Sequence, residues 1–80
     1  MNITVQFFAS YADVLGRSAV DIVLPEGATV SDLIVSLVQL PGGGSLPPRP
    51  LVAVNYAYAS PTTRLCFGDE VAVIPPAAGG

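Results

Sequence analysis

The segment ATVSDLIVSLVQLPGGG (residues 28–44) decides the fold, because it is the clearest helix pattern in the sequence. Thr29 and Asp32 have the spacing of a capping box at its amino end. Pro41 and the glycines that follow it end the helix. Apolar residues recur at positions i, i+3, i+4, i+7 and i+8 and form one stripe, made of Val30, Leu33, Ile34, Leu37 and Val38. Such a stripe is typical of a helix that packs on a core.

Two strands and a short helix are predicted before this segment. Residues 2–8 (NITVQFF) alternate as a strand does, with Ile3, Val5 and Phe7 on one face and Thr4, Gln6 and Phe8 on the other. Residues 9–16 (ASYADVLG) predict a short helix that Gly16 ends, and residues 18–25 (SAVDIVLP) predict a strand that Pro25 stops. Because this helix is too short for a parallel crossover, we expect the two strands to pair antiparallel.

The remaining strands follow the long helix. Residues 51–55 (LVAVN) predict a third strand, buried because it is continuously apolar, and residues 70–74 (EVAVI) predict the last one, after a turn at Gly68 and Asp69. Residues 56–65 are irregular, with room for a short edge strand. The order strand-strand-helix-strand-strand predicts an α+β fold, with a mixed sheet of four to five strands and one main helix across one face.

The second apolar set of the strands predicts a binding surface. If Val71 and Val73 face the main helix, Phe8 and Ile74 face away from it. Should the first and last strands be neighbours, these two side chains lie close together, and Tyr58 can join them. An exposed cluster of large apolar side chains usually marks a binding surface. The alternative is that each is a scattered surface hydrophobe.

Composition excludes several kinds of chemistry. The 80 residues form one domain and contain no histidine and a single cysteine, Cys66. A disulfide within the chain, a zinc or haem site built from this chain alone, and Ser-His-Asp or Cys-His catalysis are therefore not expected. We expect no metal site, and chemistry that uses a partner's side chains or the chain's own backbone.

Charge and hydropathy restrict the partners. The formal net charge is −3, with three arginines and no lysine, which argues against nucleic acid and suits a partner with a basic pocket. No apolar run approaches the roughly 18 residues that span a membrane. No basic region precedes an apolar stretch at the start, so we expect no secretory signal and a cytoplasmic location.

Three motifs carry a resemblance to a known family. VQFFASYADVLG (residues 5–16), PLVAVNYAYAS (residues 50–60) and above all GDEVAVIPPAAGG (residues 68–80) resemble the molybdopterin synthase small subunits, ubiquitin-like sulfur carriers of the MoaD/ThiS type. The match covers nearly the whole chain and is weakest between Gln39 and Arg49. The resemblance implies the ubiquitin-like β-grasp fold, with a domain over residues 1–76 and a flexible carboxyl-terminal tail over residues 77–80.

The resemblance also implies a sulfur-carrier chemistry. A separate activating enzyme, an adenylyltransferase, uses ATP to adenylate the Gly80 carboxylate, and a sulfur donor enzyme converts it to a thiocarboxylate. The charged carrier docks into the large synthase subunit and gives its sulfur to cyclic pyranopterin monophosphate. The family's synthase is a heterotetramer of two small and two large subunits. The small subunit itself binds no cofactor.

The same resemblance assigns the site residues. Phe8, Tyr58 and Ile74 fall where the family has its hydrophobic docking surface, although Tyr58 and Ile74 are not its commonest residue types there. Pro75-Pro76 and Gly79-Gly80 match directly. The prolines stiffen the base of the tail, and the glycines lack a Cβ and can pass through a narrow channel. Residues 77–80 can extend at most about 14 Å, enough to reach into a partner's pocket.

Three further features near the motifs have simpler expected roles. Phe67 stands where the family often has an acid, so no electrostatic contact is assigned there. Arg64 is expected to be an exposed, solvated side chain. Cys66 invites a sulfur-relay role, but we expect a small apolar filler beside the last strand, because free cysteines are commonly buried. The Gly/Pro-rich residues 40–50 are expected to form a surface loop.

Two other functions remain open at the level of sequence. One is a sulfur carrier for another pathway, such as thiazole synthesis for thiamin, although those chains usually lack the Gly-Asp-Glu-Val to Pro-Pro run. The other is a ubiquitin-like protein modifier or an interaction domain. The absence of lysine excludes lysine-linked chains on the protein itself, but not its attachment to other proteins.

Overall fold

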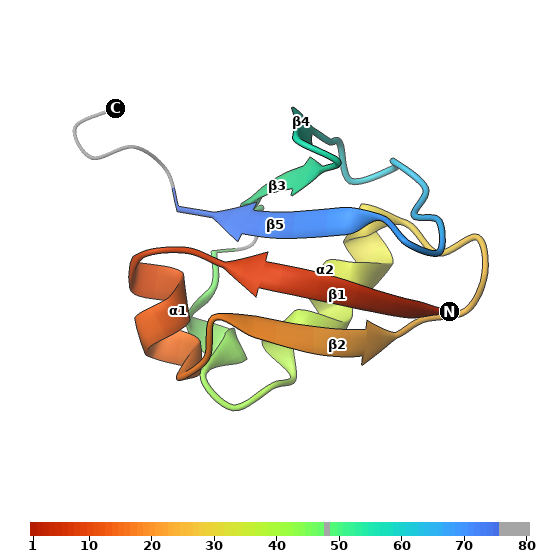
Figure 1. Ribbon diagram of the computed structural model, residues 1–80. Coiled ribbons are helices and arrows are strands. Elements are labelled where there is room, and N and C mark those ends of the chain that lie inside the picture. Colours follow the sequence, from red (N-terminus) through yellow and green to blue (C-terminus); the bar gives the residue numbers. More distant parts are fainter. Residues whose placement is uncertain (48, 76–80) are drawn as a thin grey trace.

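The structure, a computed structural model, describes residues 1–47 and 49–75. Its strands are β1 (Asn2–Phe7), β2 (Ala19–Val23), β3 (Leu51–Val54), β4 (Ala57–Tyr58) and β5 (Glu70–Ile74). Its helices are α1 (Ser10–Leu15), α2 (Val30–Val38) and the short 3-10 helix η1 (Gly43–Ser45). The predicted α+β fold is confirmed (Figure 1). The predictions for Pro76, Gly79, Gly80 and the tail fall outside the described residues.

The five strands form one mixed sheet in the order β2-β1-β5-β3-β4. β1 and β5 pair in parallel at its centre. The pairs β1–β2, β3–β5 and β3–β4 are antiparallel. The predicted antiparallel pairing of the first two strands, the adjacency of the first and last strands and the short edge strand are therefore confirmed.

Helix α2 begins where the sequence predicts. The Thr29 hydroxyl accepts a hydrogen bond from the Asp32 N–H (3.4 Å), and the Asp32 carboxylate accepts one from the Thr29 N–H (2.9 Å). This is the predicted capping box, which satisfies two N–H groups that have no partner within the helix. The N–H groups of Val30 and Ser31 donate to carbonyl groups at Thr63 and Pro61. These bonds tie the start of α2 to the segment that precedes β5.

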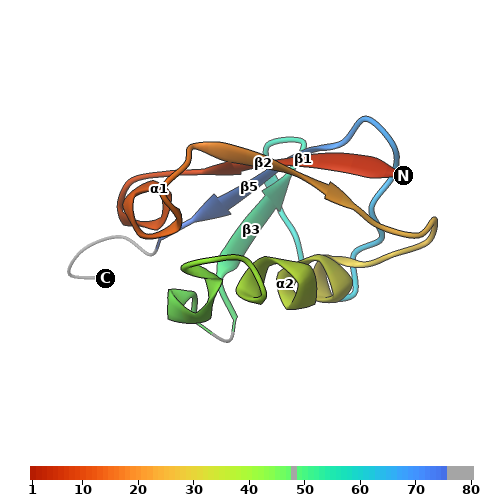
Figure 2. The same cartoon turned by 90° about the horizontal axis from the view of Figure 1, so that it is seen from below.

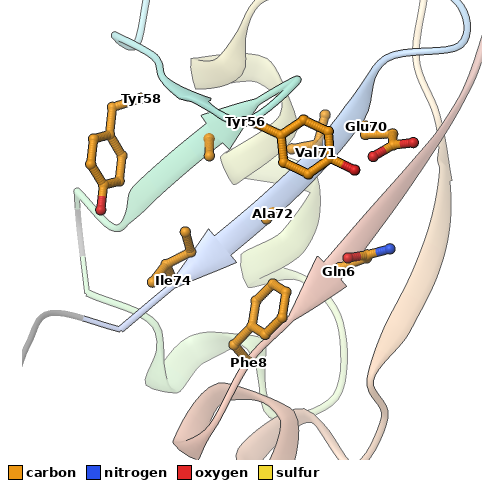
Figure 3. A pocket seen from close by; sticks show the side chains of 9 residues that line it. Gln6, Phe8, Tyr56, Tyr58, Glu70, Val71, Ala72 and Ile74 are labelled. Atoms are coloured by element: carbon orange, nitrogen blue, oxygen red, sulfur yellow. The ribbon is translucent and has the colours of Figure 1, made fainter.

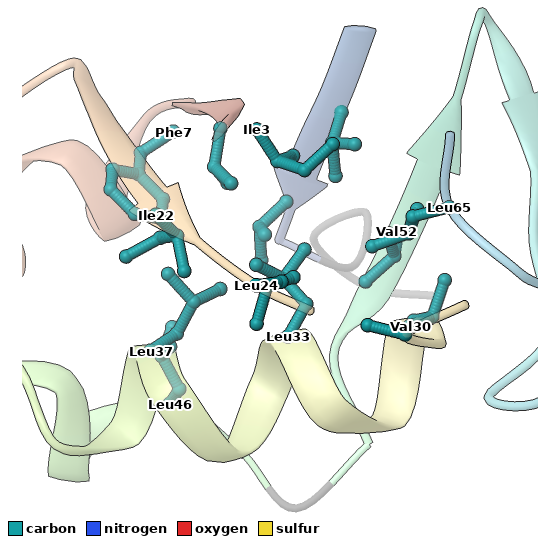
Figure 4. Packing of buried hydrophobic residues seen from close by; sticks show 14 of the residues in the cluster. Ile3, Phe7, Ile22, Leu24, Val30, Leu33, Leu37, Leu46, Val52 and Leu65 are labelled. Atoms are coloured by element: carbon teal, nitrogen blue, oxygen red, sulfur yellow. The ribbon is translucent and has the colours of Figure 1, made fainter. Parts of the chain in front are cut away.

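The core lies between α2 and one face of the sheet. Figure 2 shows α2 lying against that face, and Figure 4 shows its side chains directed toward the strands. Leu33 and Leu37 are completely buried, whereas Val38 at the edge of the predicted stripe is 37% exposed. The inward residues of the two central strands are at most 3% exposed: Ile3, Val5, Phe7, Val71 and Val73. The predicted alternation of these strands is therefore confirmed.

The loop after α2 is more buried than the predicted surface loop. Gly43 and Leu46 are buried, although Gly42, Gly44 and Ser45 are exposed. A Cβ on Gly43 would collide with the carbonyl oxygen of Leu37, and a Cβ on Gly42 would collide with that of Val14 in α1. Two of the glycines therefore let the chain pack closely between the two helices. Within residues 1–47 and 49–75, no helix is long and apolar enough to cross a membrane.

Candidate protein-docking site

The side of the sheet opposite α2, here called the open face, contains a hollow of about 330 Å³. Gln6, Ala72, Ala53 and Tyr58 lie in register across four neighbouring strands of this face. The two alanines form the floor, because their short side chains leave space between longer neighbours. The hollow is lined by Gln6, Phe8, Ala53, Tyr56, Tyr58, Glu70, Val71, Ala72 and Ile74.

One end of the hollow is apolar. Phe8 is 47% exposed and Ile74 is half-buried, and Figure 3 shows their side chains near one another at the ends of β1 and β5. Tyr58, 74% exposed, lines the hollow from the edge strand β4. The structure thus brings together the three side chains that the sequence placed on one binding surface. Their role in binding a partner stays a prediction.

The exposure of Phe8 follows from the path of the chain after β1. Phe7 faces the core, so the next side chain points to the opposite side. Ala9 then has a positive φ of 49°, which turns the chain sharply into α1. The Phe8 carbonyl accepts a hydrogen bond from the Tyr11 N–H in the first turn of that helix (3.1 Å). Phe8 is therefore held at the rim of the hollow by a defined turn.

The other end of the hollow is polar, and the sequence reasoning missed it. Tyr56 and Glu70 line this end, with Gln6 in the row next to them, and Tyr56 is 90% exposed. Figure 3 shows the Tyr56 hydroxyl directed toward the Glu70 carboxylate. Hydrogen bonding to Glu70, followed by the repulsion of its negative charge, raises the pKa of Tyr56 above the ordinary value of 10.0.

The sequence does contain a signal for this polar end. Asn55 and Tyr56 are the two residues between β3 and β4, and both have positive φ. Asparagine between two apolar runs is typical of a two-residue hairpin turn. That turn type brings Tyr56 beside the start of β5, but the usual glycine at its second position is absent, so the pattern is easily overlooked.

The described chain ends next to the apolar end of the hollow. β5 ends at Ile74, which lines the hollow, and Pro75 follows it. Pro75 has no N–H group with which to continue the sheet. The predicted site residues Pro76, Gly79 and Gly80 lie outside the described residues, but they are connected to this end of the sheet through Pro75.

The prediction that Cys66 is buried was wrong, because its side chain is exposed. The preceding residue, Leu65, takes the core position and is 2% exposed. The N–H of Cys66 donates to the Asp69 carboxylate (2.7 Å), and the N–H of Asp69 donates to the Cys66 carbonyl (3.0 Å). This tight turn, with Gly68 at φ 88°, keeps Cys66 at the surface. Arg64 is exposed, as predicted.

The described residues contain no group of three or more His, Cys, Asp or Glu side chains that could hold a metal ion. The hollow combines an alanine floor, two aromatic side chains and an aliphatic one at its apolar end, and a carboxylate at its other end. Exposed aromatic side chains around a concave apolar surface are typical of protein-binding sites. The arrangement is therefore suited to binding another protein.

Fold and site together define a small β-grasp protein with a partly apolar hollow beside the end of its last strand. A sequence profile of the ThiS family matches residues 5–80, and the chain belongs to this family.

Named relatives agree with this assignment. The molybdopterin synthase sulfur carrier subunit of Chlamydomonas reinhardtii is 35% identical over 83 residues and matches over the full length of both chains. The subunit of the same name from Drosophila erecta is 38% identical over 85 residues, covering 100% of this chain and 92% of the relative.

Solved structures match the fold closely. SAMP1 from Haloferax volcanii superimposes with a TM-score of 0.84 at 28% identity, over 100% of both chains. The structure of small archaeal modifier protein 1 from the same organism superimposes with a TM-score of 0.82 at 27% identity, over 95% of this chain and 98% of that one. A chain in the complex of subunits 1 and 2 of molybdopterin-converting factor from Helicobacter pylori gives 0.74 at 22% identity, over 100% of both chains. The last match supports the fold alone.

Proposed function

We propose that this chain is the sulfur carrier subunit of a molybdopterin synthase, acting in the cytoplasm. The Gly80 carboxylate is adenylated by a separate activating enzyme with ATP, which releases pyrophosphate. A sulfur donor enzyme then displaces AMP and leaves a thiocarboxylate. The hollow binds the large synthase subunit in a heterotetramer of two small and two large subunits, and the Gly80 sulfur passes to cyclic pyranopterin monophosphate.

The observation that carries this proposal is the position of the hollow at the end of β5. Phe8, Tyr58 and Ile74 present apolar surface where the chain leads, through Pro75, into the Gly-Gly sequence. A partner that covers this end of the hollow lies beside the start of the tail. The full-length relatives that carry the sulfur-carrier name support the same assignment.

The chemistry explains why the reacting group is placed on a tether. A carboxylate is a poor electrophile, so the exchange of its oxygen for sulfur requires an activated acyl adenylate. A sulfur atom attached to a docked protein reaches the substrate at high effective concentration and in a fixed orientation, unlike free sulfide. Gly79 and Gly80 suit a narrow partner channel because they have no side chain to obstruct it.

Mass spectrometry of protein purified from its own organism tests the proposal. We expect a fraction whose mass is greater by the difference between one sulfur and one oxygen atom, located on Gly80. Co-purification of the large synthase subunit assigns the pathway, whereas co-purification of a thiazole synthase would assign it to thiamin synthesis. A carboxylate found alone, in cells where a control carrier is charged with sulfur, would contradict the proposal.

Substitution in the tail gives a sharper test of the same chemistry. We expect Gly79→Ala and Gly80→Ala to leave the thermal unfolding midpoint unchanged and to reduce sulfur transfer at least about tenfold, since an added Cβ obstructs a narrow channel. The measurement is single-turnover product formation from chemically prepared thiocarboxylate, which separates transfer from activation. Wild-type turnover by both variants would contradict a narrow partner channel that requires glycine at these two positions.

Protein modification is the second candidate function. The close match to the Haloferax volcanii small archaeal modifier protein 1 favours it. Both functions begin with adenylation of the terminal glycine, so they can coexist in one chain. Conjugates of higher mass that contain Gly80 joined to a lysine of another protein would establish it. Their absence in cells that contain the charged carrier would leave sulfur transfer as the one function.

A further inference from the structure

The polar end of the hollow depends on a strained residue. Asn55 and Tyr56 have φ values of 52° and 69°, so both lie in the left-handed region. Asparagine tolerates this region, but a tyrosine there is unusual, and the second position of such a two-residue hairpin normally carries glycine. Strain of this kind persists where the surroundings enforce it, and it is found most often at functional sites.

Asn55 is what fixes the hairpin in place. Its side-chain amide donates to the Asp69 carboxylate (2.9 Å), and its side-chain oxygen accepts from the Glu70 N–H (3.0 Å). Its own N–H donates to the Glu70 carbonyl (2.8 Å). These three bonds join the β3–β4 turn to the start of β5. Tyr56 is therefore held above the open face with its hydroxyl toward Glu70 (Figure 3).

The charge at this end is negative and has no counter-charge within the hollow. Glu70 is exposed, and none of the described residues that line the hollow is a cation. Across the sheet, Glu70 is in register with Thr4, whose hydroxyl donates to the Asp21 carboxylate (2.7 Å). A second negative charge thus lies on the same face, two strands away. The raised pKa of Tyr56 reflects first the hydrogen bond to the Glu70 carboxylate and then its negative charge.

We propose that Tyr56 and Glu70 bind an arginine side chain of the large synthase subunit, as a second contact besides the apolar end of the hollow. This inference rests on the proposed function. A guanidinium group fits both surfaces, because it pairs with a carboxylate through two hydrogen bonds and stacks on an aromatic ring. A lysine ammonium group is a more strongly hydrated point charge and cannot form the paired hydrogen bonds in one plane.

The second contact gives the docked carrier a defined orientation. Glu70 and Ile74 are four residues apart along β5, which corresponds to about 13 Å. A partner that holds only the tail and the apolar end leaves the domain free to rotate about that point. A cation bound at the far end of β5 removes this freedom. The tail then enters the partner from one direction.

Two substitutions test the contact without disturbing the tail. The probe is the large synthase subunit of the same organism, titrated calorimetrically with the full-length protein at low and high salt. We expect Glu70→Gln to weaken binding about tenfold at low salt, as for a charged interface contact, and the difference to vanish near 1 M salt, where the Debye length is about 3 Å. Glu26→Gln, an equal change of charge at an exposed position outside the hollow, should bind as the wild type does.

Tyr56→Gly separates binding from stability. Glycine accepts the positive φ that strains tyrosine, so this variant should unfold at a higher temperature than the wild type. It should nevertheless bind the large subunit about fivefold more weakly, because the ring is lost. A purely structural role for Tyr56 predicts no loss of affinity.

The outcomes distinguish this inference from the proposed function. If Glu70→Gln and Tyr56→Gly both bind as tightly as the wild type at low salt, while Phe8→Ala weakens binding, the arginine contact is excluded and the docking site is retained. If the wild type itself does not bind the large subunit, both are overturned. Weaker binding by both variants, with the salt dependence lost in Glu70→Gln, supports the contact.

Discussion

The two faces of the sheet are built from the same strands but differ in burial and in chemistry. On the face covered by α2, the side chains of Ile3, Val5 and Val73 are completely buried. On the open face, Phe8 and Ile74, which follow the buried Phe7 and Val73 in the chain, remain accessible beside an alanine floor. The covered face is uniformly aliphatic and aromatic, whereas the open face changes from apolar to acidic along β5.

This difference teaches that the alternation of the strands places the stabilising side chains on one face and the proposed docking side chains on the other. In a chain of 80 residues, one covered face must supply nearly all the hydrophobic stabilisation. Side chains on the open face gain little from folding and remain available to a partner. Substitutions on the covered face should therefore change the free energy of unfolding, and those on the open face should change affinity.

Leu33→Ala should have the largest effect on the covered face. Leu33 is completely buried between α2 and the sheet, so truncation leaves a cavity (Figure 4). We expect the free energy of unfolding to fall by about 2–5 kcal/mol, measured by urea denaturation. A decrease below about 1 kcal/mol would show that the core can collapse around the site and that the covered face is less tightly packed than the structure indicates.

Gly43→Ala should have the next largest effect, because it tests the loop that closes this face. Its added Cβ would collide with the Leu37 carbonyl, whereas a Cβ on Gly44 would meet open space. We expect a loss of about 1–3 kcal/mol for Gly43→Ala and little change for the matched variant Gly44→Ala. Equal unfolding free energies for the two variants would mean that Gly43 is not closely packed in solution. The loop would then be the surface loop that its composition predicts.

Phe8→Ala should show the opposite behaviour. Phe8 is half-exposed in the free protein and lines the apolar end of the hollow. We expect the affinity for the large synthase subunit to fall about tenfold or more, which corresponds to at least about 1.4 kcal/mol, while the unfolding free energy changes by less than about 1 kcal/mol. The control is Val23→Ala, because Val23 is 80% exposed and lies outside the hollow. A similar loss of affinity in both variants would argue against a localised docking site.

Much of this arrangement could be predicted from local patterns. The capping box, the buried stripe of α2 and the alternation of β1 and β5 each depend on a few neighbouring residues. The prediction that Phe8 and Ile74 lie close together needed one further assumption, that the first and last strands are adjacent. The sheet order confirms this assumption. The resemblance to sulfur carriers gave the same fold independently.

The features that sequence reasoning missed depend on the path of the chain. The roles of Gly42 and Gly43 arise from helices α1 and α2 that approach one another only in the folded protein. Cys66 is exposed because Leu65 fills the core position next to it. Tyr56 could not be placed because an Asn-Tyr pair is a weak turn signal without glycine.

The smallest predicted effect concerns the polar end of the open face. Glu70 raises the pKa of Tyr56 above 10.0, so Glu70→Gln should lower it toward that value, because the substitution removes the hydrogen bond to a carboxylate and its negative charge. In the wild type the folded state holds the tyrosine proton more tightly than the unfolded state. The resulting stabilisation is complete below pH 10 and is lost as pH rises through the raised pKa.

An NMR titration of Tyr56 in the wild type, Glu70→Gln and the control Glu26→Gln measures this shift directly. We expect the control to retain the raised pKa, since Glu26 lies outside the hollow. An unchanged pKa in Glu70→Gln would mean that the hydroxyl and the carboxylate do not interact in solution. Glu70 would still make this end of the open face acidic, but it would lack the paired tyrosine on which the proposed arginine contact depends.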